Sequence, residues 1–190
     1  AGHRVTVYNR TEKKAQQWVQ EFGGKSAKTP RDAAASAQIV FSCVGNDADL
    51  ASVMLGETGA LAGMRKDAIA FDNTTASAKI ARELYAEARK RGLHFIDAPV
   101  SGGQAGAVNG QLAVMCGGDK PAFDRAQPVA MAFAKAVTLI GDSGAGQLTK
   151  MVNQLCIAGL AEGLSEGISF GQAAGLDMKL VLEVIGKGAA

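Results

Sequence analysis

Apolar and polar residues alternate along the first three quarters of the chain in a rhythm typical of strands and helices. Short apolar runs at 4–8, 39–44, 68–71 and 93–96 predict strands. Helical spacing at 12–22 and 77–91 predicts helices between them, and a further apolar run at 137–140 predicts another strand. Strands that alternate with helices indicate a largely parallel sheet covered by helices. The pattern therefore predicts an α/β fold with a doubly wound sheet.

Capping residues mark the start of two helices. Thr29 precedes Pro30, which is tolerated in the first turn of a short helix that leads into residues 33–37. Ser77 caps the helix predicted at 77–91. Gly92 ends that helix before the next strand. One apolar stripe runs along it, formed by Ile80, Leu84, Tyr85 and Ala88.

Polar loops follow three of the predicted strands, at 44–47, 72–75 and 97–101. Open α/β sheets bind their ligands at the carboxyl ends of the strands. We therefore expect these loops to share one crevice.

A long helix at about 147–174 changes the pattern and indicates a second, all-α domain. We place the boundary so that residues 1–142 form the sheet domain and residues 143–190 begin the helical one. Glycine recurs every fourth residue along this helix, at 159, 163, 167, 171 and 175, which predicts close packing against it. Glu162 and Glu166 interrupt the apolar run, so a membrane span is not expected.

Composition and charge narrow the function classes. The 190 residues include 20 Lys and Arg against 18 Asp and Glu, without a run of either sign, which excludes a nucleic-acid footprint and a membrane-attracting patch. Cys43, Cys116 and Cys156 are widely spaced, which favours a reducing, cytoplasmic location over a disulfide framework. His3 and His94 have no partner at metal-ligand spacing, so we expect no metal site.

Two motifs carry the candidate chemistry. Residues 97–107, DAPVSGGQAGA, form a glycine-rich loop whose backbone amides can bind an oxyanion. Residues 144–154, GAGQLTKMVNQ, contain an amine at Lys150 with carboxamides one helical turn later. This combination suits carbonyl or alcohol chemistry. A hydrolase is disfavoured because Ser101 has neither a histidine nearby nor a Gly-x-Ser-x-Gly elbow.

Together, the two motifs and their spacing resemble the β-hydroxyacid dehydrogenases related to 3-hydroxyisobutyrate dehydrogenase and tartronate semialdehyde reductase. The resemblance extends over the whole chain and implies a Rossmann-like sheet followed by the start of a helical domain with a long interdomain helix. Such proteins usually begin with a strand and a Gly-x-Gly-x-x-Gly turn ahead of the segment that resembles 1–11. Because that turn normally holds the cofactor pyrophosphate, we expect the 190-residue chain to bind a dinucleotide poorly alone.

The resemblance also implies catalytic and substrate-binding roles. Lys150 would be the general acid and base, exchanging a proton with the substrate oxygen as hydride moves. Ser101, Gly102 and Gly103 would bind the carboxylate of a small acid. Asn153 and Gln154, three and four residues after the lysine, would orient substrate or amine. Some relatives carry Asn-Asn at these last two positions, so Gln154 departs from the pattern.

The cofactor implied is NADP or NAD. Asn9, Arg10 and Thr11 follow the strand whose end normally faces the adenine ribose. Neutral and positive groups there favour a 2′-phosphate, so we expect NADP. Val44, Gly45 and Thr75, in two of the strand-end loops, would face the nicotinamide.

Three other interpretations of the function stay open. A phosphogluconate-type dehydrogenase would carry a histidine at the position of Asn153, and imine reductases usually lack the lysine. A non-catalytic dehydrogenase-like module would not need Lys150 or Ser101. For the complete protein we expect a small carboxylate substrate and a homodimer or homotetramer.

Overall fold

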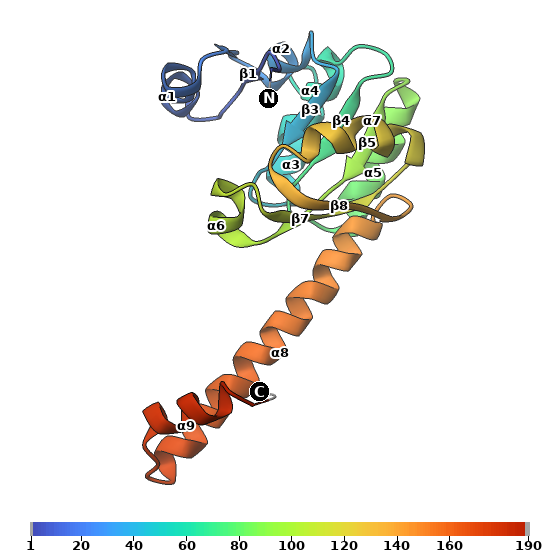
Figure 1. Ribbon diagram of the computed structural model, residues 1–190. Coiled ribbons are helices and arrows are strands. Elements are labelled where there is room, and N and C mark those ends of the chain that lie inside the picture. The colour runs from blue at the N-terminus through green and yellow to red at the C-terminus, as the bar shows by residue number, and fades with distance from the viewer. Residues whose placement is uncertain (1, 189–190) are drawn as a thin grey trace. The chain divides into compact units, whose positions relative to one another are not determined.

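The computed structural model describes residues 2–188 and divides the chain into two compact units that meet between Lys150 and Met151. Figure 1 shows the elements of both units. The strands are β1 (Thr6–Val7), β2 (Lys25–Ser26), β3 (Ile39–Ser42), β4 (Ile69–Asp72), β5 (His94–Asp97), β6 (Val100–Ser101), β7 (Leu112–Gly117) and β8 (Ala134–Gly141). The helices are α1 (Glu12–Phe22), α2 (Pro30–Ala34), α3 (Asp47–Met54), α4 (Ala60–Gly63), α5 (Ala78–Lys90), α6 (Gly103–Val108), α7 (Lys120–Ala130), α8 (Ala145–Ala173) and α9 (Met178–Ile185).

The main sheet of the first unit has six strands in the order β3-β4-β5-β7-β6, with β8 paired to β7. Strands β3, β4 and β5 are parallel, whereas β7 runs antiparallel to both β5 and β6. The predicted α/β class is confirmed. The antiparallel strands β6 and β7 were not predicted. Strand β6 lies within the glycine-rich loop 97–107, which has no strand-like alternation, and β7 is a short apolar run, which periodicity alone does not assign to a strand.

A separate pair of strands, β1 and β2, lies at the start of the chain. They are parallel to each other and are joined through α1. Among the described residues, neither β1 nor β3 has a strand partner on its other edge. The observed parallel strands thus form three groups, β2-β1, β3-β4-β5 and β7-β8.

The predicted helix signals are confirmed. Thr29 Oγ1 accepts a hydrogen bond from Asp32 N at 3.0 Å, and Ser77 Oγ accepts one from Ile80 N at 3.1 Å. Gly92 follows α5 with a φ of +67°, which a residue with a side chain rarely adopts. The caps fix where α2 and α5 begin.

Apolar side chains pack on both faces of the main sheet. Along β4, Ala70 belongs to one cluster, together with Leu50 from α3 and Leu84 from α5. Ile69 and Phe71 belong to the other cluster, which α7 covers. Alternate residues of a strand point to opposite faces, so β4 is buried on both sides. A sheet covered by helices on both faces directs its ligands to the strand ends.

The second unit consists of the remainder of α8 together with α9. A methyl group built at Gly171 would collide with Met178, so the predicted close packing holds at this glycine. At Gly159, Gly163 and Gly167 no described atom lies within 4 Å of such a group. None of the helices in the described residues is long and apolar enough to cross a bilayer.

Candidate active site

The first turn of α8 is held by a buried carboxylate at the end of β5. Asp97 Oδ1 accepts a hydrogen bond from Gly144 N at 2.7 Å, and its Oδ2 accepts one from Gln147 N at 3.0 Å. The residue is fully buried, and burial raises the pKa of its carboxyl, while the backbone donors lower it. Asp97 therefore satisfies amides that a helix start leaves without partners.

The backbone of α8 approaches β5 very closely at Gly146. A Cβ atom built there would lie 2.6 Å from the Asp97 carbonyl oxygen, so only glycine fits. Lys150 follows one turn later with 9% of its surface exposed. The close approach fixes the backbone of this turn against the end of the sheet.

A second buried carboxylate ends the neighbouring strand. Asp72 is the register partner of Asp97 across β4 and β5. Its Oδ1 accepts hydrogen bonds from Ser42 Oγ at 2.6 Å and Thr74 Oγ1 at 2.7 Å. Among the described residues, its Oδ2 is the buried side-chain oxygen without a partner. Burial raises the pKa of Asp72 to about 6.

Thr74, which Asp72 holds, connects two of the loops predicted to face the cofactor. Thr74 Oγ1 donates to Asp72 and also accepts from Val44 N at 3.1 Å, which joins the loop after β3 to the loop after β4. Thr75 is exposed between the buried residues Thr74 and Ala76. The candidate nicotinamide residues Val44 and Thr75 therefore sit in loops that one hydrogen-bond chain joins.

Gln147 extends this chain to α8. Its Oε1 accepts from Ala76 N at 3.0 Å, and its Nε2 donates to the Thr74 carbonyl oxygen at 2.7 Å. The loop that carries Thr75 and the helix that carries Lys150 are thus joined through one side chain.

The predicted carboxylate-binding loop contains a strand and the start of a helix that were not predicted, β6 and α6. Ser101 ends β6 and is the register partner of Ala113 in β7. Gly102 and Gly103 have φ values of +129° and +60°, which favour glycine at both positions, and α6 begins at Gly103. Both glycines are exposed.

The two carboxamide candidates fall in the second unit, further along α8. Asn153 Nδ2 donates to Gln154 Oε1 at 3.0 Å. Asn153 is partly exposed and Gln154 is exposed. Their roles toward substrate stay predictions.

A cavity of about 1810 Å³ lies between the N-terminal segment and β3. Its lining includes the candidates for both ends of the cofactor, namely Asn9, Arg10, Thr11, Val44 and Gly45. The other candidates are not among the lining residues, namely Thr75, Ser101, Gly102, Gly103, Lys150, Asn153 and Gln154.

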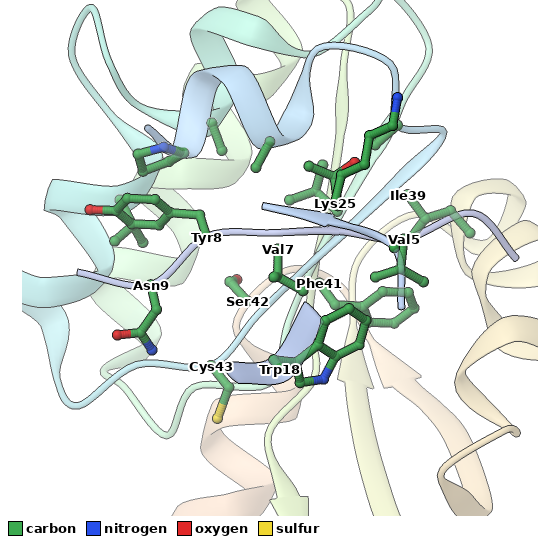
Figure 2. A pocket seen from close by; sticks show the side chains of 18 of the residues that line it. Val5, Val7, Tyr8, Asn9, Trp18, Lys25, Ile39, Phe41, Ser42 and Cys43 are labelled. Carbon is green, nitrogen blue, oxygen red and sulfur yellow. The ribbon is translucent and has the colours of Figure 1, made fainter. Parts of the chain in front are cut away.

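Much of the cavity wall is apolar. Figure 2 shows apolar side chains that line it, among them Val5 and Val7 from the N-terminal segment, Trp18 of α1 and Phe41 of β3. The volume exceeds the roughly 300–1,000 Å³ of an ordinary ligand pocket. The cavity lies between β1 and β3, neither of which has a further strand partner among the described residues.

Polar and charged groups of the cofactor candidates line part of the cavity. Arg10 Nη1 forms an ion pair with Asp49 Oδ1 at 3.1 Å, and its side chain is 84% exposed, so the guanidinium is accessible to a phosphate. Thr11 N donates to Asn9 Oδ1 at 2.8 Å. A Cβ atom at Gly45 would lie 2.9 Å from Asp49 Oδ2, so a side chain there would require the Asp49 side chain to move.

A metal site has no candidate in the part of the chain that the structure describes. No group of three or more His, Cys, Asp and Glu residues there could hold an ion. Cys43 and Cys156 are exposed and Cys116 is buried, and all three are free thiols.

Three residues of this site were missed in the sequence, namely Asp72, Thr74 and Gln147. Asp72 and Thr74 follow a predicted strand, and that position was the available signal. Gln147 stands inside the second motif, but its partners lie 71 and 73 residues away. Local sequence patterns do not predict contacts between residues that are so far apart in the chain.

Two family models together match nearly the whole chain. Residues 1–141 match the NAD-binding domain of 6-phosphogluconate dehydrogenase. Residues 144–190 match the NAD-binding model of NADP-dependent 3-hydroxyisobutyrate dehydrogenase.

Oxidoreductases of known sequence or structure are similar to nearly the whole of this chain. An uncharacterised oxidoreductase of Shewanella frigidimarina is 59% identical, over 100% of this chain and 65% of its own length. A probable mitochondrial 3-hydroxyisobutyrate dehydrogenase-like protein of Arabidopsis thaliana is 41% identical, over 100% of this chain and 63% of its own. The structure of Mycobacterium tuberculosis 3-hydroxyisobutyrate dehydrogenase with L-serine superposes with a TM-score of 0.89 at 29% identity, over 99% of this chain and 63% of that one. The chain thus spans less than two thirds of these relatives.

Proposed function

Because the chain belongs to the β-hydroxyacid dehydrogenase family of NAD(P)-binding oxidoreductases, we propose that the full-length protein interconverts a small 3-hydroxyacid and its semialdehyde or ketone. One observation carries the proposal. Lys150 stands one turn into a helix whose start is fastened both to the end of β5 and to the loop of Thr75. A titratable amine on a rigid support beside a cofactor loop suits proton transfer coupled to hydride transfer.

Lys150 is the general acid and base of the proposed reaction. When bound, the nicotinamide cofactor supplies or accepts the hydride. In reduction, the Lys150 ammonium donates a proton from Nζ to the substrate carbonyl oxygen. In oxidation, the neutral amine removes the hydroxyl proton. The low exposure of Lys150, at 9%, supports this role because few water molecules can compete for its proton.

The glycine loop binds the substrate carboxylate in this proposal. The Ser101 hydroxyl and the amides of Gly102 and Gly103 would donate to the carboxylate, and the positive φ values of the two glycines support a loop without side chains at these positions. Asn153 and Gln154 orient the substrate or the Lys150 amine.

NADP is the proposed cofactor, with NAD as the alternative. Arg10, flanked by Asn9 and Thr11, would bind the 2′-phosphate of the adenine ribose. Val44, Gly45 and Thr75 would hold the nicotinamide end. The hydrogen bond between Val44 N and Thr74 Oγ1 supports a shared role for their two loops.

Reduced-nicotinamide absorbance tests the proposal directly. The full-length enzyme is offered small semialdehydes and 3-hydroxyacids with both cofactors in both oxidation states. We expect turnover, and a loss of about 100- to 10,000-fold in kcat on Lys150→Met, because methionine keeps most of the volume but carries no proton. Lys135→Met, on an exposed residue of β8, is the matched control and should leave kcat within about twofold.

Absence of turnover across the panel would contradict the proposal. The panel also includes a cyclic imine: turnover of the imine alone would favour an imine reductase, and no turnover of any compound would favour a non-catalytic module. Full activity of Lys150→Met would remove the lysine from the chemistry.

The assembly of the full-length protein stays a prediction of a homodimer or homotetramer. A cytoplasmic location also stays a prediction.

A further inference from the structure

Gln147 is an unusual residue to find at 0% exposure. A buried carboxamide destabilises a fold unless its polar atoms have partners, and an apolar residue would fill the same space without that requirement. Both ends of this carboxamide have partners in the backbone of one loop. Packing alone does not account for such a residue.

The two side-chain hydrogen bonds of Gln147 go to backbone groups on either side of one loop residue, Thr75. Oε1 accepts from Ala76 N at 3.0 Å, and Nε2 donates to the Thr74 carbonyl oxygen at 2.7 Å. These two groups lie on either side of Thr75. The side chain of Gln147 thus holds the backbone before and after Thr75, which is itself exposed.

The backbone of Gln147 is held at its other side by the sheet. Its N–H donates to Asp97 Oδ2 at 3.0 Å. Lys150 comes three residues later, and residues three apart lie on the same side of a helix. The side chain of Gln147 therefore joins the loop of Thr75 directly to the turn of α8 that carries Lys150.

We infer that Gln147 is a positioning residue that sets the separation between the nicotinamide loop and the proton donor. This inference rests on the proposed function, in which Thr75 faces the nicotinamide and Lys150 exchanges the proton. Gln147 does not touch substrate. It holds two groups at a fixed spacing, so that the proton and the hydride reach the same carbonyl group in one step.

The test compares two glutamines in the full-length enzyme. Gln147→Met removes both hydrogen bonds and keeps a side chain of similar length. Gln127→Met is the matched control, because Gln127 Nε2 also donates to a backbone carbonyl, that of Val137, at 3.0 Å, between α7 and β8. For both variants we measure kcat, the KM of each substrate, the thermal midpoint and the isotope effect with deuterated reduced cofactor.

A positioning role predicts a specific split. For Gln147→Met, kcat should fall about 10- to 100-fold while both KM values stay within about threefold, because misalignment acts on the reacting geometry more than on binding. The isotope effect should rise as hydride transfer becomes slower than product release. For Gln127→Met, which loses one partly buried hydrogen bond away from the site, kcat should stay within about twofold. Equal kcat values for the two variants would overturn the inference.

Amide hydrogen exchange gives a readout that does not depend on turnover. Gln147→Met should speed exchange in residues 74–77 and 144–150 together, and Gln127→Met should leave both segments unchanged. If wild type shows no turnover, the proposed function fails, yet joint exchange still supports the connection. Unchanged exchange in either segment of Gln147→Met overturns it, whatever the activity.

Discussion

The carboxyl ends of β4 and β5 differ from those of β1 and β3 in how their polar groups are satisfied. At β4 and β5, Asp72 and Asp97 are fully buried and bind neighbouring loops and the start of α8. At β1 and β3, Arg10 and Cys43 are exposed beside a large cavity. The proposed proton-transfer side is therefore built into the sheet, while the proposed nucleotide side is open.

This contrast indicates that the two halves of the site depend on different interactions. The proton-transfer side depends on buried hydrogen bonds within the sheet unit, whose loss affects stability as well as activity. The nucleotide side depends on exposed charges, whose loss affects binding preference with little effect on the fold.

Asp97→Asn should have the largest effect on stability. Asparagine has one acceptor oxygen for the two amides of Gly144 and Gln147, and its NH₂ group would face an N–H donor. We expect a loss of about 2–4 kcal/mol in the free energy of unfolding, measured by urea denaturation.

A matched cap elsewhere serves as the control. Asp177 Oδ1 accepts from Lys179 N and Leu180 N at the exposed start of α9. Asparagine can replace it there with one oxygen, so Asp177→Asn should change stability by less than about 0.5 kcal/mol. Equal losses for the two variants would contradict the contrast between the buried and exposed regions.

Asp72 should make stability depend on pH in an intermediate range. Its pKa is raised to about 6 from 3.8, so the folded state binds its proton more tightly than the unfolded state does. Its contribution is complete below the unfolded pKa and is lost as pH rises through the folded pKa. Between pH 7.5 and 5, wild type should gain about 1–2 kcal/mol relative to Asp72→Asn.

Urea midpoints of the two proteins across this range measure the difference. The comparison removes the contributions of all other groups, including Asp97, because both proteins share them. Parallel curves for wild type and Asp72→Asn would show that the carboxyl titrates as it does in the unfolded chain.

Arg10→Ala should have the smallest effect, confined to cofactor choice. Its side chain is 84% exposed, and its pair with Asp49 can open toward a phosphate. In the full-length enzyme we expect the preference for NADPH over NADH to fall roughly fivefold in kcat/KM, with thermal stability unchanged. Lys13→Ala, on an exposed residue of α1 outside the cavity lining, should leave the preference as in wild type.

Local elements of the fold could be predicted well from the sequence. The helix predicted at 12–22 is α1 with the same bounds, and the predicted cap Ser77 begins α5. Such features depend on nearest neighbours and on helical or strand periodicity, both of which are present in a short stretch of sequence.

Long-range hydrogen bonds could not be predicted in the same way. The carboxylate of Asp97 binds residues 47 and 50 positions later, and no local pattern reports such a contact. The sequence marked Asp97 and Gln147 only as members of two motifs. Their connection depends on the order of strands in the sheet, which alternation alone does not determine.

The hydrogen bonds of Asp97 and Gln147 also determine which parts of the protein open together. Asp97 binds the amides of Gly144 and Gln147, and the Gln147 side chain binds the loop on both sides of Thr75. Segments of a protein that are joined in this way tend to unfold locally as one cooperative unit. The end of β5, the loop of Thr75 and the first turn of α8 should therefore open together rather than one at a time.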